Sequence, residues 1–300
     1  MSFMFNFNAH NDEGENTNNK FNDASVDVNK DTKETKDQKL ISLPAVEVTD
    51  FYNNSVISKL AFKTLTFGEH FFQIVNTKCI EKELLNQEDA IQSSKTVLDA
   101  INAHSDLVPG TYEGGLKIWE CGIDLVKYLS SSESRHILEV KGKVVLELGC
   151  GAGLPGLYSL KAGAKRVDFQ DYNIDVLKLL TQPNVVRNCT EQRCRYFAGD
   201  WSGFNQIATE QKLRYDVILT AETIYNPENY SKLHDIFSMS LTDDGVILVA
   251  AKTYYFGVGG SLDTFVNYVR SCNEFKADTI LTIQEGVPRQ IFSLKRVCAS

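Results

Sequence analysis

VVLELGCGAGLPG, residues 144–156, decides the fold of this chain. The apolar run at 144–148 is typical of a parallel strand inside a sheet, because a strand buried on both faces loses the alternation of polar and apolar residues. Gly149, Gly151 and Gly153 allow a loop with positive φ, in which a ligand can lie against backbone N–H groups. Pro155 suits the first turn of a helix. The stretch therefore predicts a strand, a glycine loop and a helix that bind a nucleotide-like cofactor.

Two cofactors use such a loop. Gly151, Gly153 and Gly156 match the dinucleotide pattern G-x-G-x-x-G, with Asp171 twenty positions after Gly151 as a ribose-binding acid. Glu147 extends the glycines into the S-adenosylmethionine pattern E-x-G-x-G-x-G. S-adenosylmethionine carries a sulfonium and an ammonium, which favour nearby carboxylates, so Glu147 favours this second cofactor. The alternative is that these are ordinary turn glycines and that Glu147 is a strand-end acid.

The composition indicates a soluble globular protein with one large core, or a core plus an extension. The formal net charge of −8 argues against sequence-independent binding of nucleic acid through the whole surface. A local basic patch is still compatible with this charge. The seven cysteines include no C-x-x-C pair, and the five histidines are scattered. We therefore expect no metal site, no disulfide framework and a reducing compartment. No run is long enough to cross a bilayer, and no membrane association is expected.

Composition divides the chain into three parts. Residues 1–39 are rich in Asn, Asp, Lys and Thr and are expected to form a disordered tail. Residues 40–109 are expected to form an accessory α+β segment, with strands at 62–67 and 71–75 and one or two helices within 80–103. Residues 110–300 are expected to form the main domain.

The main domain alternates strands and helices. Strands are expected at 144–148, 166–170, 195–198, 217–221 and 246–251, and helices at 119–129, after Pro155, at 174–180, from Pro227 and at 261–272. A closing hairpin is expected from 279–284 and 290–294. This order predicts an α/β fold with a doubly wound, mostly parallel sheet and antiparallel pairing at its end.

Polar residues follow the strands at the edge where such sheets bind ligands. Asp171 can accept from both ribose hydroxyls, and Tyr172 can lie against adenine. Asp200 can accept from the adenine amino group, while Trp201 supplies a flat apolar face. Glu222 faces the entry of a methyl acceptor. The alternative is that Trp201 is a core residue and Glu222 a helix-capping acid.

Residues 112–121, YEGGLKIWEC, are too polar and rich in glycine for a core strand. They predict a lid in which Trp119 and Glu120 cover the methionine portion of the cofactor. The alternative is a loop that leads into a helix, with Trp119 filling a groove.

Six segments carry a specific resemblance. YEGGLKIWEC from residue 112, QDYN from 170, GDW from 199, ETIYN from 222, and AAK from 250 with YFGVGG from 255 resemble the eukaryotic protein-histidine N-methyltransferases. That family uses S-adenosylmethionine to modify one histidine of a large-subunit ribosomal protein. The resemblance runs from about residue 105 to the end of the chain. Related lysine methyltransferases usually carry Asp where this chain has Glu222, a difference that favours the histidine branch.

The resemblance implies a seven-stranded class I methyltransferase fold, Rossmann-like, with an N-terminal extension and S-adenosyl-L-methionine as cofactor. The cofactor-binding residues, including Glu147 from the glycine motif, are expected to be Ile118, Trp119, Glu120, Glu147, Gly149, Gly151, Asp171, Tyr172, Asn173, Gly199, Asp200, Trp201 and Ala221. Candidates for orienting the acceptor are Glu222, Tyr225, Tyr254 and Tyr255.

The implied activity is protein-histidine N-methylation of a large-subunit ribosomal protein. Two alternatives stay open: a protein-lysine or small-molecule methyltransferase of the same fold, and a ribosome-assembly module whose catalysis is incidental. We further expect a monomer in the cytoplasm and nucleus that binds no nucleic acid directly.

Overall fold

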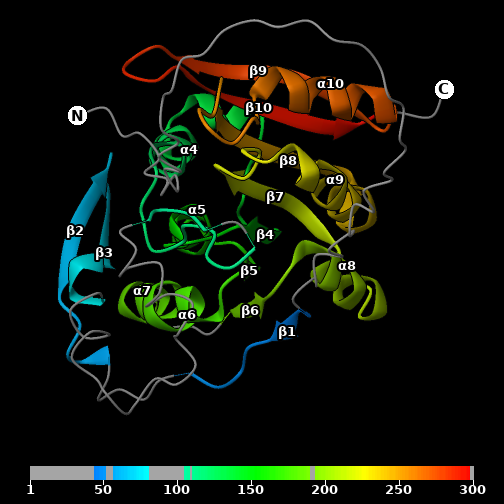
Figure 1. Ribbon diagram of the computed structural model, residues 1–300. Helices are drawn as coiled ribbons and strands as arrows, with labels where there is room; N and C mark the ends of the chain where they lie inside the picture. Colours follow the sequence, from blue (N-terminus) through cyan, green and yellow to red (C-terminus); the bar gives the residue numbers. More distant parts are fainter. Residues whose placement is uncertain (1–43, 52–56, 81–104, 109, 190–192, 298–300) are drawn as a thin grey trace, which may run out of the picture.

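Residues 144–156 form an interior strand, a loop and the start of a helix in the computed structural model. The structure describes residues 44–51, 57–80, 105–108, 110–189 and 193–297. Strand β4 (Val144–Leu148) lies within an eight-stranded sheet, and its residues from Val145 onward are buried (Figure 1). Helix α5 (Leu154–Lys161) follows the glycine loop and carries Pro155 in its first turn.

The sheet has the strand order β1-β6-β5-β4-β7-β8-β10-β9. The other strands are β1 (Val46–Glu47), β5 (Arg166–Asp171), β6 (Cys194–Ala198), β7 (Tyr215–Ala221), β8 (Leu241–Lys252), β9 (Phe275–Ile283) and β10 (Arg289–Arg296). Strands β4 to β8 pair in parallel, whereas β10 pairs antiparallel with β8 and β9. The predicted doubly wound sheet with an antiparallel end is confirmed. The sheet contains the seven strands predicted for the main domain and one more, the short β1, which pairs antiparallel with β6.

Helices cover both faces of the sheet because successive strand residues point to opposite faces. Val145 belongs to a core shared with α4 (Glu120–Ser130), α5 and α7 (Gln182–Asn188). Leu146 belongs to a second core. That core is shared with α8 (Trp201–Glu210), α9 (Tyr230–Ser240) and α10 (Leu262–Cys272). The loops that leave the parallel strands therefore meet at one edge between the two helix layers.

The sequence prediction differs from the structure most in three elements. The helix expected to end at residue 180 continues through α6 (Ile174–Val176), a π-helical stretch (Leu177–Thr181) and α7. Pro183 cannot donate a backbone hydrogen bond, and the wider π turn before it lets the helix continue. Strand β8 begins at Leu241, five residues early, through a T-D-D-G sequence that is typical of a turn. Helix α8 was not predicted, although Asp200 caps it by accepting from Ser202 N at 2.8 Å.

The segment before the main domain is joined to it by specific contacts. Strands β2 (Phe62–Phe67) and β3 (His70–Val75) are the two strands predicted here, and they pair antiparallel beside α7 (Figure 1). Asn184 Oδ1 accepts from Val75 N at 2.7 Å, and Asn188 Oδ1 accepts from Gln73 N at 2.9 Å. The predicted tail at 1–39 and the predicted helices beyond residue 80 lie outside the described residues, and the domain boundaries stay predictions. Across the described ranges, no helix is long and apolar enough to cross a membrane.

Candidate active site

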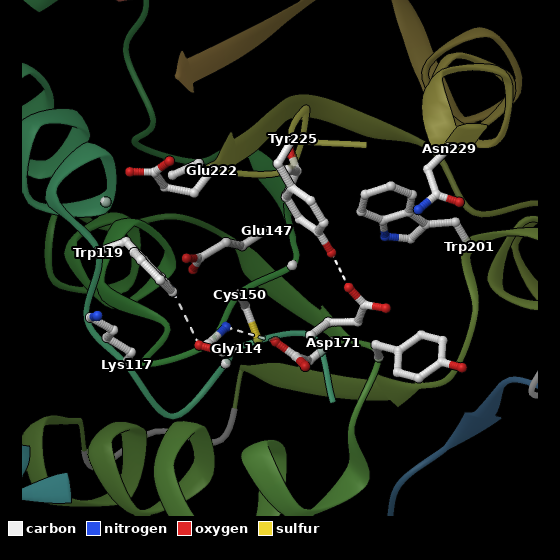
Figure 2. Close-up of a pocket in the computed structure, with 18 of the residues that line it drawn as sticks. Gly114, Lys117, Trp119, Glu147, Cys150, Asp171, Trp201, Glu222, Tyr225 and Asn229 are labelled. Atoms are coloured by element: carbon white, nitrogen blue, oxygen red, sulfur yellow. Dashed lines mark hydrogen bonds between the residues drawn. The ribbon is translucent and has the colours of Figure 1, made fainter. Parts of the chain in front are cut away.

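A cavity of about 670 Å³ lies at the carboxyl ends of β4, β5, β6 and β7. Figure 2 shows Glu222 and Trp119 on one side of it, Trp201 and Asn229 on the other, and Glu147 and Tyr225 between them. The lining comes from the segment at 110–122, the glycine loop, and the residues that follow the parallel strands. The predicted location at the carboxyl edge of the sheet is confirmed.

The glycine loop forms the floor of this cavity. Gly151 has a φ of 49°, and a Cβ atom there would lie 3.0 Å from the carbonyl oxygen of Gly115. A Cβ atom on Gly115 would in turn lie 2.8 Å from Val176 Cγ2. The close approach of the loop to the segment above it therefore requires glycine at 151, whereas Gly115 is required by its contact with Val176.

Glu147 is a buried acid beneath the loop. Its Oε2 accepts from Gly156 N at 2.7 Å, which fixes the first turn of α5. Burial raises the pKa of Glu147 well above its ordinary value, although the Gly156 N–H lowers it. A cation in the cavity would favour the ionised form of this carboxyl group.

Asp171 ends β5 and points into the same cavity. Its Oδ2 accepts from Gly151 N at 2.9 Å and its Oδ1 accepts from Asn173 N at 3.1 Å. Burial raises the pKa of Asp171 to about 6, with the two N–H groups acting in the opposite direction. Each carboxylate oxygen has a second lone pair, so Asp171 can still accept from ribose hydroxyls.

Asp200 and Trp201 build the opposite side of the cavity. Asp200 Oδ2 pairs with Lys232 Nζ at 2.8 Å, while Oδ1 caps α8. Burial raises the pKa of Asp200, but the hydrogen bonds from Lys232 and Ser202 outweigh it and lower the pKa overall. Trp201 Nε1 donates to Gln170 Oε1 at 2.9 Å, which fixes the indole beside the cavity. An aromatic face beside an ionised acid suits an adenine ring with its amino group.

The lid is predicted at 112–121, and residues 110–119 form one wall of the cavity. Asn173 accepts from Glu113 N at 3.1 Å and donates to the carbonyl of Thr111 at 2.8 Å, so it holds the lid to β5. The Tyr225 hydroxyl donates to Glu113 Oε2, joining the lid to the segment after β7. Trp119 Nε1 donates to the carbonyl of Gly114 at 3.0 Å. These bonds place a wall over the glycine loop that can exclude water from a bound ligand.

Glu222 marks the far end of the cavity from Trp201 (Figure 2). It has a φ of 60°, a strained value for a residue with a side chain. Its side chain is buried, and neither carboxylate oxygen accepts a hydrogen bond of normal geometry from the described residues. An ion pair joins its Oε1 to Lys252 Nζ at 3.3 Å. Glu222 belongs to the cavity lining although both of its carboxylate oxygens are buried, and a buried carboxylate calls for a hydrogen-bond donor.

The structure brings most of the predicted site residues together. Those in the cavity lining are Ile118, Trp119, Glu147, Gly149, Gly151, Asp171, Tyr172, Gly199, Asp200, Trp201, Ala221, Glu222 and Tyr225. The sequence analysis missed several polar lining residues, namely Glu113, Lys117, Asn226, Glu228, Asn229 and Lys232. The predicted helix start at Pro227 was the signal that could have placed Asn226, Glu228, Asn229 and Lys232 at the carboxyl edge of the sheet.

Four predicted residues do not line the cavity. Glu120 turns to Lys252, with Oε2 and Nζ 3.3 Å apart. The Asn173 side chain is hydrogen-bonded to the backbone of the lid. Tyr255 is fully buried, and its hydroxyl accepts from Lys252 N at 3.2 Å. Tyr254 is half exposed and also lies outside the lining. These residues can act on a ligand in the cavity only through their neighbours.

The donor set fits S-adenosylmethionine. Carboxylates surround the cavity at Glu147, Asp171, Asp200 and Glu222, which suits a ligand with a sulfonium and an ammonium. Asp171 and the glycine loop would hold the ribose, Asp200 and Trp201 the adenine, and the lid the methionine portion. Within the described residues, no group of acidic, histidine or cysteine side chains could hold a metal ion.

The sheet order and this cavity define a class I S-adenosylmethionine-dependent methyltransferase. A family model described as lysine methyltransferase matches residues 103–257. The chain is 39% identical to the histidine protein methyltransferase 1 homolog of Bos taurus, over 74% of this chain and 65% of that protein. It is 36% identical to the Mus musculus homolog, over 80% of this chain and 71% of that protein. The chain belongs to this histidine protein methyltransferase family.

A solved structure from Streptococcus mutans, described as a candidate S-adenosylmethionine-dependent methyltransferase, shares the fold. Its TM-score is 0.51 at 11% sequence identity, and the match covers 78% of this chain and 55% of that one. This likeness supports the fold and carries no information on the acceptor.

Proposed function

We propose that this protein transfers a methyl group from S-adenosylmethionine to a ring nitrogen of a histidine in a large-subunit ribosomal protein. The observation that carries the proposal is the buried Glu222 carboxylate, which belongs to the cavity lining at the end opposite the adenine wall. Relatives that are named histidine protein methyltransferases support the choice of histidine. The ribosomal acceptor rests on the resemblance set out in the sequence analysis.

When bound, S-adenosylmethionine supplies an electrophilic methyl group on a positively charged sulfur. The acceptor imidazole needs no general base, because its neutral form already presents a lone pair near pH 7. The second ring nitrogen carries an N–H, which Glu222 can accept. This hydrogen bond orients the ring, and the carboxylate stabilises the positive charge that the ring gains during the reaction.

The remaining residues keep the site dry and shaped. Tyr225 and Glu113 close the wall between the lid and the segment after β7. Burial and the nearby Glu113 carboxylate raise the pKa of Tyr225 well above its ordinary value, so this hydroxyl stays a hydrogen-bond donor. Exclusion of water strengthens the interaction between Glu222 and the ring.

A lysine acceptor is the second candidate, because the matching family model carries the description lysine methyltransferase. The same carboxylate could pair with a lysine ammonium. The two candidates differ in the modified residue, which amino-acid analysis of the product identifies. A ribosome-assembly module with incidental catalysis would instead bind its partner equally well after Glu222→Ala.

The test is to incubate the protein with large-subunit ribosomal proteins and S-adenosylmethionine carrying a labelled methyl group. Acid hydrolysis and chromatography then separate methylhistidines from methyl-lysines. We expect label in methylhistidine, and its loss after Glu222→Ala. Label in methyl-lysine alone would contradict the histidine assignment. The monomeric state, the cytoplasmic and nuclear location, and the absence of nucleic-acid and membrane binding stay predictions.

A further inference from the structure

The loop that follows β8, residues 253–260, presents two neighbouring aromatic side chains to solvent. Phe256 is 69% exposed and Tyr254 is 47% exposed. Their ring centres lie 4.9 Å apart in an edge-to-face arrangement. Neither ring belongs to the lining of the cavity. Aromatic side chains are enriched where proteins bind other proteins, so this exposed pair is a candidate contact for a partner.

The backbone of this loop is fixed by contacts at both of its ends. Thr253 N donates to the carbonyl oxygen of Pro288 at 2.9 Å, and Gly260 N donates to that of Tyr225 at 2.8 Å. A Cβ atom on Gly260 would lie 2.3 Å from the Tyr225 carbonyl oxygen, so this approach requires glycine. Because the loop is already ordered, a partner that binds the two rings would pay little conformational entropy for fixing the backbone.

The exposed pair flanks the end of the cavity at which Glu222 lies. Strands β7 and β8 lie side by side and pair in parallel, so the loop leaves the sheet at the same edge as Glu222 (Figure 1). Tyr225, which holds Gly260, lines the cavity. Burial, and after it the Glu222 carboxylate, raise the pKa of Tyr255 well above its ordinary value. The residue between the two exposed rings is therefore a neighbour of Glu222.

The charge around the pair is negative. Among residues 224–230, 253–264 and 284–288, the exposed charged side chains are all acidic. They are Glu228, Asp263 and Glu285. Of the cations nearby, Lys252 is buried between carboxylates and Arg289 pairs with a carboxylate on α4. An aromatic pair with acids around it attracts a cationic side chain, and the same acids repel a phosphate backbone.

We propose that Tyr254 and Phe256 form the docking surface for a basic segment of the acceptor protein, next to the residue that is methylated. An arginine or lysine of that segment would lie against the rings, with the acids around it. This inference rests on the proposed function and adds the part of the enzyme that recognises its protein substrate. The surface contributes binding of the acceptor and no chemistry, so its loss should change KM for the acceptor and leave kcat unchanged.

The first experiment removes the rings with the double variant Tyr254→Ser/Phe256→Ser. The matched control is Phe71→Ser, which removes a ring that is 61% exposed on β3. The Phe71 carbonyl accepts from Lys161 at the end of α5 that points away from the cavity. The acceptor is the large-subunit ribosomal protein that takes up labelled methyl groups from S-adenosylmethionine. Uptake of label is measured against the concentration of that purified protein, S-adenosylhomocysteine affinity by calorimetry and folding by thermal unfolding.

The second experiment reverses the charge near the rings with Asp263→Lys/Glu285→Lys. Its matched control is Asp243→Lys/Asp244→Lys, which reverses two exposed acids at the opposite end of β8. Both pairs change the net charge of the protein by the same amount. A difference between them therefore reports the position of the charge and not its total.

We expect the aromatic double variant to raise KM for the acceptor by about tenfold or more, because removal of a central aromatic contact weakens protein binding by at least that factor. Its kcat at saturating acceptor and its affinity for S-adenosylhomocysteine should change less than about twofold. The charge reversal near the rings should raise KM by about threefold or more, and KM of the wild type should rise with salt. Both controls should match the wild type.

An unchanged KM in the aromatic double variant would overturn the inference, and so would an equal rise in Phe71→Ser. A charge reversal near the rings that matches its control would contradict a basic partner. Light scattering that shows dimers in the wild type and monomers in the aromatic variant would assign the surface to a second copy of this chain instead. If the double variant does not fold, Phe256→Ser alone carries the same test.

Failure of the proposed function gives a different result. Methyl-lysine as the sole product, or no label in any large-subunit ribosomal protein, overturns the proposed function and with it the partner named here. Formation of methylhistidine with an unchanged KM in the aromatic variant leaves the proposed function standing and overturns only the docking surface.

Discussion

Asp171 should make cofactor affinity depend on pH. Burial holds its pKa at about 6, whereas the ordinary value is 3.8. The folded protein therefore keeps the proton over a range where the unfolded chain releases it, and the free energy of unfolding falls as pH rises from about 4 to 6. The shift of about two pKa units corresponds to about 3 kcal/mol of stability that is present below pH 4 and lost above pH 6.

Binding has the opposite pH dependence. Only the ionised Asp171 can accept from both ribose hydroxyls, so affinity for S-adenosylhomocysteine should rise with pH and level off above about pH 7. At pH 5 about one tenth of a group with a pKa near 6 is ionised, which predicts an affinity about tenfold weaker than at pH 8. Asp171→Asn should weaken S-adenosylhomocysteine binding at pH 8 by about tenfold or more, because a charge-assisted hydrogen bond contributes about 1.5–3 kcal/mol. The rise in affinity between pH 5 and 7 should also disappear in this variant.

Titration calorimetry at pH 5, 6, 7 and 8 measures the effect. Asp200→Asn is the matched control, because the pKa of Asp200 is lowered and its proton is lost below this range. Asp200→Asn should bind S-adenosylhomocysteine more weakly than the wild type, but its affinity should rise with pH in the same way. An Asp171→Asn protein whose affinity still rises between pH 5 and 7 as the wild type does would refute the reasoning.

Three further outcomes are expected. Gly156→Ala should lower the free energy of unfolding by about 1–3 kcal/mol, because the new Cβ would lie 2.4 Å from Phe169 Cε1; an unchanged midpoint in urea would contradict this. Tyr225→Phe should raise the KM for cofactor with little change in the free energy of unfolding, because the variant loses the hydrogen bond between Tyr225 and Glu113 that holds the lid. Equal KM values for variant and wild type would show that this hydrogen bond does not hold the lid. The rate on a histidine acceptor should fall as pH drops through about 6–7, where imidazole becomes protonated; a rate that keeps rising well above pH 8 would indicate lysine.

The sheet was predictable because its signals are local and agree with one another. Buried apolar strands, the glycine loop and the acids after each strand all follow from short-range patterns, and Asp171 and Trp201 reach the cavity as expected. Helix α8 was missed because Asp200 was assigned to the ligand, whereas the same carboxylate also caps the helix. A residue type alone does not reveal that one side chain has both roles.

The acceptor end of the cavity was harder to predict because long-range pairing decides it. Glu120 and Lys252 are more than a hundred residues apart, and only the fold shows that they pair. Tyr255 follows Lys252 closely, yet its ring is buried and its hydroxyl accepts from the Lys252 backbone. Asn173 lies two residues after Asp171 but turns to the lid. Spacing along the chain predicts which residues lie at the carboxyl edge of the sheet. It does not predict the direction in which each side chain points.

The central claim is that the buried carboxylate of Glu222 in the cavity lining receives the N–H of an acceptor histidine. The most direct measurement is amino-acid analysis of large-subunit ribosomal proteins after methylation by the wild type and by Glu222→Ala, each first shown to bind S-adenosylhomocysteine. The account predicts methylhistidine with the wild type and at least about a tenfold lower yield with the variant at similar cofactor affinity, as expected for loss of a charge-assisted hydrogen bond. Methyl-lysine as the sole product, or an equal yield of methylhistidine from both proteins, would contradict it.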